Sequence, residues 1–188
     1  MIIKSKIRAL GIDDGPFDKF KNKRVRIYGT VMRGNSLIEG FLTATIRVDG
    51  DDVTNKVIDM IKNSQFKTQI RVIFTDGITF GGFNILDPFF ISNNFNIPVI
   101  VVIRKNPDIE KIRLTLKKLN KLNELKILNS LPKPIYYNNI FFQPINIDEE
   151  KSKRLIDLFT LSSFLPEPLR ISHLIGQMFH FKRSKGHP

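Results

Sequence analysis

The sequence predicts an α/β protein in which helices flank both faces of a mixed central sheet. Three segments with the alternating pattern of strands come first along the chain, and a helical pattern follows them. Later, the short apolar runs 70–75 and 97–103 are typical of parallel strands that are covered on both faces. An antiparallel start followed by βαβ units therefore indicates an antiparallel first three strands and parallel strands after them.

The first half of the chain accounts for the antiparallel part of this sheet. Residues 7–13 alternate between two faces, and residues 24–33 and 37–48 predict two longer strands. Gly34 and Asn35 both tolerate a positive φ, so they suit a hairpin turn between the longer strands. Apolar residues at helical spacing then predict a helix over 52–63.

The second half supplies the crossovers and the covering helices. A crossover helix is expected within 82–95, between the two parallel strands, despite Pro88. The remaining expected elements are a basic amphipathic helix from 107 or 108 to 119, a strand over 140–142, a helix over 148–161 and a last helix over 168–179. Because no internal repeat or Gly/Ser-rich linker divides the chain, we expect one domain over 1–188.

The composition excludes several classes of protein. The 188 residues include no cysteine, which excludes disulfides, thiol nucleophiles and zinc sites with cysteine ligands. No apolar run is long enough to cross a membrane, and the first residues, Met1-Ile2-Ile3-Lys4, lack the pattern of a signal peptide. We therefore expect a soluble cytoplasmic protein with no membrane partner.

The net charge of +12 is unevenly distributed. Segments 1–34, 101–128 and 151–188 carry net charges of +6, +5 and +5, whereas 35–100 and 129–150 each carry −2. Basic segments around an acidic middle suit the recruitment of nucleic-acid phosphates to a carboxylate centre. A genome-wide bias toward Lys, Ile and Asn is the alternative explanation of this composition.

Acidic residues gather where the expected strands end. Asp13 and Asp14 close the first strand, a cluster over 49–52 follows the third, and Asp76 closes the fourth. Carboxylates that converge from neighbouring strands can hold Mg²⁺ or Mn²⁺, because hard cations prefer oxygen ligands. Within the cluster, either Asp49 or Asp52 would complete the site. The alternative is that these residues only form turns and helix caps.

The last expected helix carries a polar stripe. Arg170, His173 and Gln177 follow the i, i+3, i+7 spacing of one helical face and combine a basic, a titratable and an amide group. A solvated polar face is the alternative interpretation. The apolar residues of this helix are expected to pack against the core; they are Leu169, Ile171, Leu174, Ile175 and Met178.

Five strings occur in one order along nearly the whole chain. They are GIDDG (11–15), VDGDDVT (48–54), TDGITFGGFN (75–84), PVIVVIRK (98–105) and PEPLRISHLI (166–175). Together they resemble the archaeal endonuclease V-like family of domains of unknown function (DUF ninety-nine), which is related to endonuclease V. The resemblance implies a ribonuclease H-like fold and an action near deaminated purines in DNA, chiefly hypoxanthine.

The resemblance also implies roles for the acidic strand ends and the histidine. Asp13 and Asp76 match the metal-binding aspartates of endonuclease V, and Asp49 is the best match for the intervening glutamate. His173, in PEPLRISH, matches the histidine of a similar motif in endonuclease V. The implied catalytic residues are therefore Asp13, Asp76 and His173, with Asp13, Asp49 and Asp76 as ligands of Mg²⁺ or Mn²⁺.

Two further groups of residues are expected around this centre. Gly81, Gly82 and Asn84 are expected to form the base pocket, because glycine allows close backbone approach and Asn can read a purine edge. The expected phosphate-binding residues are Lys105, Arg104 and Arg170.

Three functions remain open on this basis. The first is DNA repair by endonuclease V-like cleavage at deaminated purines, hypoxanthine or xanthine, with DNA rather than RNA as the partner. The second is removal or exchange of the base without strand cleavage or a metal, because the chain lacks two features of endonuclease V. These are the proline-tyrosine wedge and the histidine soon after the Asp-Gly, where this chain has Gly81-Gly82-Phe83. The third is a non-catalytic nucleic-acid-binding module. The oligomeric state is left open.

Overall fold

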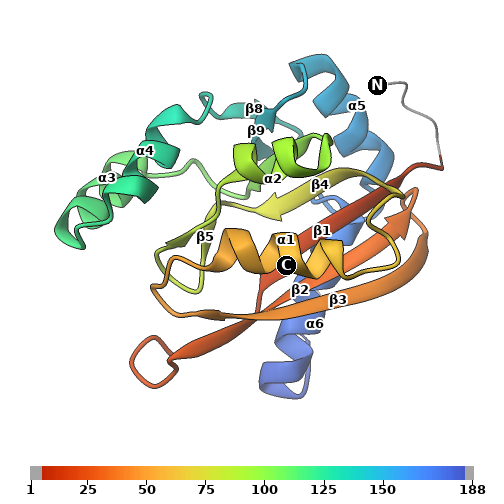
Figure 1. Cartoon of the computed structure of the whole chain (residues 1–188). Helices are drawn as coiled ribbons and strands as arrows, with labels where there is room; N and C mark the ends of the chain where they lie inside the picture. Colours follow the sequence, from red (N-terminus) through yellow and green to blue (C-terminus); the bar gives the residue numbers. More distant parts are fainter. Residues whose placement is uncertain (1–5, 185–188) are drawn as a thin grey trace.

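The computed structural model describes residues 6–184 and is built around a mixed seven-stranded sheet (Figure 1). The strand order is β3-β2-β1-β4-β7-β9-β8. The first three strands are antiparallel, whereas β1, β4 and β7 are mutually parallel, as predicted. An antiparallel pair that the sequence did not predict as such, β9 and β8, extends the sheet beyond β7. The strands are β1 Arg8–Asp14, β2 Arg24–Arg33, β3 Leu37–Arg47, β4 Ile70–Asp76, β7 Val99–Ile103, β8 Ile135–Tyr137 and β9 Ile140–Ile145.

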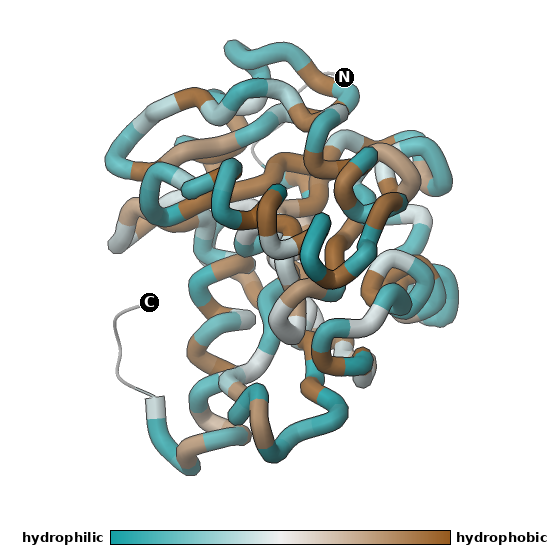
Figure 2. The backbone as a smooth tube through the Cα atoms, turned by 90° about the vertical axis from the view of Figure 1, so that its left-hand side faces the viewer, coloured by the Kyte–Doolittle hydropathy of each residue, from teal (hydrophilic) through white to brown (hydrophobic). Residues whose placement is uncertain are grey.

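Helices cover both faces of the sheet. Figure 1 shows α1 in front of the sheet and α6 behind it, and hydrophobic segments gather in the middle of the molecule in Figure 2. The first face packs on α1 Val53–Lys62, α2 Pro88–Phe95, α3 Ile109–Lys118 and α4 Leu122–Ser130, and the second on α5 Glu149–Phe159 and α6 Glu167–Phe181. Within 6–184, no helix is long and apolar enough to cross a membrane. Residues 1–4, which suggested the absence of a leader, lie outside the described part.

Capping residues set the ends of several helices where the sequence predicted them. Asp52 and Asn63 flank α1 as its N-cap and C-cap. The side chain of Asp108 accepts a hydrogen bond from Lys111 N at 3.0 Å, and that of Asp148 accepts one from Lys151 N at 2.8 Å. These bonds satisfy backbone donors that the first turn of a helix leaves free, so α3 and α5 begin where the aspartates stand.

The crossover between β4 and β7 differs from the prediction. The expected helix over 82–95 begins only at Pro88, because Asp87 caps it and the proline ring favours the first turn. The residues before it form a small hairpin instead, with β5 Thr79–Phe80 paired to β6 Asn84–Ile85. The helix α4 was also not predicted.

The close contact of α6 with β1 depends on a glycine. A Cβ atom on Gly11 would lie 2.2 Å from the carbonyl carbon of Pro168, so only glycine lets the start of α6 approach this strand. Ser172 Oγ donates to the carbonyl oxygen of Gly11 at 2.9 Å and lies 2.8 Å from Thr30 Oγ1. The buried side of α6 thus includes two small residues, Ser172 and Gly176, together with the larger Leu169. The predicted packing of Met178 is wrong, because its side chain is exposed.

Candidate functional site

Three side chains meet at the carboxyl edge of the two parallel strands β1 and β4. Asp13 lies near the end of β1, Asp76 ends β4, and α6 brings His173 to the same place. One potential ligand atom from each of the three lies within 4.8 Å of the other two. The structure therefore brings together the three residues that the sequence indicated as catalytic, and they form a group that can hold a metal ion.

His173 is held between two hydrogen-bonding partners. Its Nδ1 lies 2.7 Å from Asp13 Oδ2, and its Nε2 lies 2.9 Å from Gln177 Nε2. With Gln177 Nε2 as the donor, the proton of a neutral imidazole lies on Nδ1 and is donated to the carboxylate. Asp13 is only 4% exposed, so this bond forms in a largely desolvated place. Gln177 therefore orients the imidazole ring that forms the hydrogen bond with Asp13.

Arg104 provides positive charge at the acidic group. Its Nη2 donates to Asp76 Oδ2 at 2.5 Å and lies 3.8 Å from Asp13 Oδ2. The Nε of the same guanidinium is buried and has no hydrogen-bond partner within 6–184. The guanidinium therefore meets the two aspartates through Nη2. The neighbouring Lys105 is exposed.

Burial and mutual repulsion make two carboxyl groups unusually weak acids. Desolvation, and then the charge of Asp13, raise the pKa of Asp76 to about 6 despite the opposing effect of Arg104. The same two causes raise the pKa of Asp14 to about 7, although its Oδ2 accepts a hydrogen bond from Gly81 N at 2.7 Å. The centre thus has more negative charge than Arg104 compensates. Asp14 was visible in the sequence only as the neighbour of Asp13.

Asp49 lies outside the three-residue group. Its Oδ1 accepts a hydrogen bond from Phe83 N at 2.8 Å, and its Oδ2 lies 3.6 Å from Lys19 Nζ. A Cβ atom on Gly82 would lie 2.3 Å from the same Oδ1, so Asp49 and Gly82 together shape the loop after β5. The Asp52 carboxylate also lies outside this group, and it accepts a hydrogen bond from Asn84 Nδ2 at 2.7 Å. The structure thus joins neither candidate for the third carboxylate to Asp13 and Asp76.

The predicted base-reading role of Asn84 is wrong. The residue is fully buried, and its Oδ1 accepts a hydrogen bond from Val53 N at 3.0 Å. Its Nδ2 donates to Arg47 O at 2.9 Å and to Asp52 Oδ1, so both N–H donors of the amide are occupied. Gly81 is buried as well, and its N–H is occupied by Asp14. These residues therefore join β3, α1 and the β5–β6 hairpin.

Arg170 also differs from its predicted role. Its Nε and Nη2 lie 2.9 Å and 2.7 Å from Oε2 of Glu167, a carboxylate that is only 3% exposed. A buried carboxylate needs such a partner, because the loss of hydration would otherwise be uncompensated. Arg170 therefore compensates the negative charge of Glu167 in the first turn of α6. Its Nε and Nη2 are occupied by this carboxylate, so they do not make the predicted contact with a phosphate.

A hollow lies beyond the ends of β4 and β7, and its lining begins at Gly77, the residue that follows Asp76. It has a volume of about 390 Å³ and is mostly apolar, with Gly77, Thr79, Ile103 and Gln143 among its lining residues. Gln143 is itself buried and donates from Nε2 to Pro132 O at 2.6 Å. The hollow has room for a planar ring. No local sequence pattern indicates it, because its lining comes from four separate segments.

Comparisons with known proteins agree with this architecture. Residues 5–180 match the family model described as endonuclease dU. A UPF0215 protein of Methanocaldococcus jannaschii is 45% identical over 181 residues, which cover 95% of this chain and 97% of the relative. A UPF0215 protein of Methanothermobacter thermautotrophicus is 38% identical over 189 residues, which cover 98% and 93%.

Solved structures extend the similarity to more distant proteins. A protein of unknown function from Archaeoglobus fulgidus is 35% identical, with a TM-score of 0.86 over 93% of this chain and 98% of that one. Endonuclease V of Ciona intestinalis, in complex with DNA containing an inosine, is 13% identical, with a TM-score of 0.62 over 94% and 87%. The predicted ribonuclease H-like fold is therefore confirmed. Because the family model and the relatives cover nearly the whole chain, the protein belongs to the endonuclease dU family.

Proposed function

We propose that this protein is a metal-dependent endonuclease that cleaves DNA next to a deaminated base. The observation that carries the proposal is the group formed by Asp13, Asp76 and His173 at one edge of the sheet. The description of the family, endonuclease dU, favours deoxyuridine as the target. The inosine-containing DNA bound by the Ciona endonuclease V favours a deaminated purine, hypoxanthine or xanthine, as the second candidate.

The residues at the centre fit a hard divalent cation. Asp13 and Asp76 would hold Mg²⁺ or Mn²⁺ through carboxylate oxygens, while His173 keeps its hydrogen bond to Asp13. The raised pKa of Asp76 reflects desolvation and the charge of Asp13, and a cation at this position would relieve both. When bound, such an ion neutralises phosphate charge and makes a bound water more acidic.

The protein side chains around the centre have separate tasks. His173, held by Gln177, keeps the Asp13 carboxylate in one orientation through its Nδ1 proton. Arg104 would contact the phosphate, because its guanidinium charge lies beside the two aspartates. Lys105, exposed and next in the chain, would add positive charge at the entrance.

The deaminated base would occupy the hollow beyond the ends of β4 and β7. Taken out of the base stack, it would lie against Gly77 and Ile103, where the surface is apolar and the volume of about 390 Å³ admits one ring system. This location replaces the pocket that the sequence suggested around Gly81, Gly82 and Asn84, whose polar groups are already occupied. The size of the hollow does not by itself favour uracil over hypoxanthine, so both are tested.

The decisive experiment uses end-labelled DNA duplexes that carry one deoxyuridine, hypoxanthine or xanthine. Each is incubated with Mg²⁺, with Mn²⁺ and with EDTA, and the products are resolved before and after alkali. We expect direct cleavage that requires the metal and falls about 100-fold or more in Asp13→Asn and Asp76→Asn. The control variant is Asp59→Asn, an exposed carboxylate on α1 that should leave cleavage unchanged.

Two results would contradict the proposal. Breaks that arise only after alkali, and equally in EDTA, would move the chemistry to the glycosidic bond and indicate base removal. Binding of the damaged strand with no product under any condition would indicate a binding module. In the second case, free guanine or adenine is added to test base exchange.

A further inference from the structure

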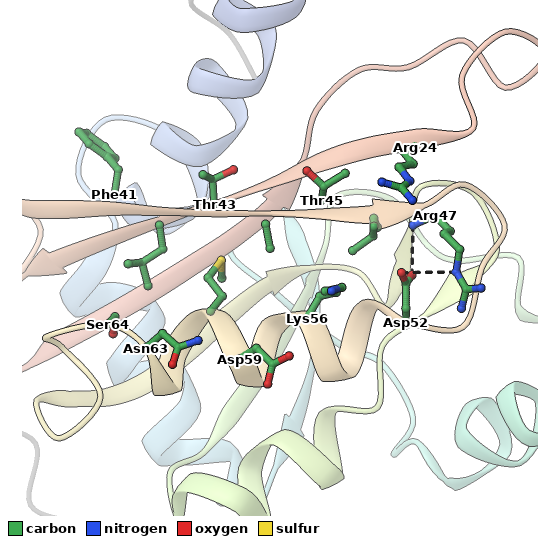
Figure 3. A pocket seen from close by; sticks show the side chains of 14 residues that line it. Arg24, Phe41, Thr43, Thr45, Arg47, Asp52, Lys56, Asp59, Asn63 and Ser64 are labelled. Carbon is green, nitrogen blue, oxygen red and sulfur yellow. Dashed lines mark hydrogen bonds and ion pairs between the residues drawn. The ribbon is translucent and has the colours of Figure 1, made fainter.

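The ribbon formed by β2 and β3 has one face that the helix α1 does not cover. On β3, Leu42, Ala44 and Ile46 pack toward the core on the α1 side. The alternate residues Phe41, Thr43 and Thr45 are exposed and point away from α1 in Figure 3. Alternation along the strand therefore leaves a row of uncovered side chains on the outer face of this edge ribbon.

The neighbouring strand adds two arginines and a tyrosine to the same face. In the register of β2 with β3, Tyr28 pairs with Thr43 and Arg26 pairs with Thr45. Paired residues of antiparallel strands share a face, so Arg26, Tyr28 and the alternate Arg24 lie on the face opposite α1, where the end of α6 covers Tyr28. Both arginines are exposed, and neither guanidinium forms an ion pair with any residue in 6–184.

The end of α6 forms an aromatic wall beside this face. Phe179 stacks on Tyr28, with ring centroids 5.7 Å apart and an angle of 8° between the planes. The side chain of Phe179 is nevertheless 60% exposed, and that of Phe41 is 57% exposed. A mostly apolar hollow of about 460 Å³ lies between these rings, with Ile175 and Met178 at its side. We call the surface made by Arg24, Arg26, Tyr28, Phe41 and Phe179 the ribbon groove.

The ribbon groove extends toward residues that neighbour the acidic centre along the chain. A second hollow of about 240 Å³ is lined by both arginines, Tyr28 and Phe179, and it also includes Gly15 and Gly176. Gly15 follows the Asp13–Asp14 pair in the chain, and Gly176 lies one helical turn after His173. The lining of this hollow therefore comes within two residues of Asp13 on one segment and within three residues of His173 on the other.

We propose that the ribbon groove holds an unpaired stretch of the DNA strand that flanks the cleaved phosphate. Unpartnered arginines next to exposed aromatic rings are the combination that binds single strands, because phosphates meet positive charge while bases stack on the rings. The inference rests on the proposed function for the source of the strand. A second copy of this chain fits the face less well, since an isologous contact would bring the same unpaired arginines of both copies together.

Binding of DNA to single-site variants tests the proposal. A fluorescent single strand with one deoxyuridine is titrated in EDTA, where the strand stays intact, and anisotropy gives the affinity. We expect about tenfold weaker binding for Arg26→Ala and for Phe179→Ala, and a salt dependence reduced by about one charge for Arg26→Ala alone. Lys67→Ala and Phe90→Ala are matched controls, because both side chains are exposed and lie away from the ribbon groove.

A spectroscopic probe reports on stacking itself. The chain contains no tryptophan, so Phe179→Trp introduces a single fluorophore into the ribbon groove. Its emission should be quenched when the single strand binds, because a base stacks on the indole ring. The control is Phe90→Trp, on α2, whose emission should not change.

The outcomes separate this proposal from the proposed function. If the wild-type protein binds and cleaves DNA while Arg26→Ala and Phe179→Ala match their controls, the ribbon groove is not the strand site and the nuclease assignment stands. If the variants weaken binding but the wild type cleaves nothing, the groove stands and the nuclease assignment fails. If sedimentation shows a dimer that Phe41→Glu dissociates, and the probe at 179 is unaffected by DNA, the face is a self-association surface and the proposal is overturned.

Discussion

Replacing Gly11 with alanine would test how the last helix is held against the sheet. The added Cβ would lie 2.2 Å, 2.3 Å and 2.5 Å from backbone atoms of Pro168 and Leu169. Ordinary contacts of a Cβ atom are 3.4–4 Å, so the start of α6 would have to move by more than about 1 Å. His173 lies on the same helix, and the substitution would therefore displace a member of the candidate site.

The expected cost follows from two contributions. Overpacking a close-packed contact costs about 1–3 kcal/mol, and the upper end applies because backbone atoms cannot rotate away as a side chain does. Moving α6 also weakens the hydrogen bond from Ser172 Oγ to Gly11 O, which contributes about 1 kcal/mol. We expect a loss of about 3–4 kcal/mol in the free energy of unfolding, depending on how far the hydrogen bond is weakened, which lowers Tm by about 6–16 °C for a chain of this size.

Urea unfolding and thermal melting measure this loss, and the cleavage assay measures the effect on the site. Gly29→Ala is the matched control, because the two nearest atoms to the added Cβ would be Leu10 Cδ1 at 3.0 Å and Met60 Cε at 3.3 Å. These atoms are the ends of flexible side chains, so the control should cost about 1 kcal/mol or less. Equal stabilities of Gly11→Ala and the wild type, or equal losses in the two variants, would refute the reasoning.

Three further predictions concern buried polar groups. Asn84→Ala should lower the free energy of unfolding by about 2–3 kcal/mol in urea, because it leaves Val53 N and other buried groups without partners; an unchanged midpoint would contradict this. Arg170→Ala should lower the free energy of unfolding by about 3 kcal/mol, because it leaves the buried Glu167 carboxylate without its charged partner, and adding Glu167→Gln should restore most of that loss. Weaker DNA binding without any loss of stability would instead support a phosphate contact. Finally, the free energy of unfolding in EDTA should fall between about pH 4 and about pH 7, and it should fall more steeply in the wild type than in Asp14→Asn. Over this range the Asp14 carboxyl of the native state, with its pKa near 7, retains a proton that the same carboxyl of the unfolded chain, with a pKa of 3.8, releases. Parallel pH profiles of the two proteins would show that Asp14 is not the cause.

Local sequence patterns predicted the parts of the fold that local physics determines. Caps such as Asp108 and Asp148 satisfy the first turn of their own helices, so their positions can be read from a few neighbouring residues. The helix α2 begins later than predicted because its start depends on Asp87 and Pro88. Among the residues before it, Asn84 forms hydrogen bonds with β3 and α1 instead. The strand β8 depends on its pairing with β9 and has only a weak pattern of its own.

The candidate site was predictable to the extent that topology determines it. Because β1 and β4 are parallel neighbours, aspartates at their ends must meet, and a helix crossing β1 can bring His173 to them. The roles of Asn84 and Arg170 were not predictable, since an amide or guanidinium looks the same in a sequence whether it meets a ligand or a buried neighbour. The hollow beyond the ends of β4 and β7 could not be predicted either, because it exists only where separate segments leave space.

The site joins residues from opposite ends of the chain, with Asp13 and His173 separated by 160 positions. During synthesis, both aspartates leave the ribosome well before α6 does, and N-terminal segments fold while the rest is still being made. A nascent chain, or one cut before α6, would therefore carry the carboxylates without the histidine that orients them. Completion of the fold thus controls when the three-residue group first exists, and partial chains would not expose a finished centre to the nucleic acids around them.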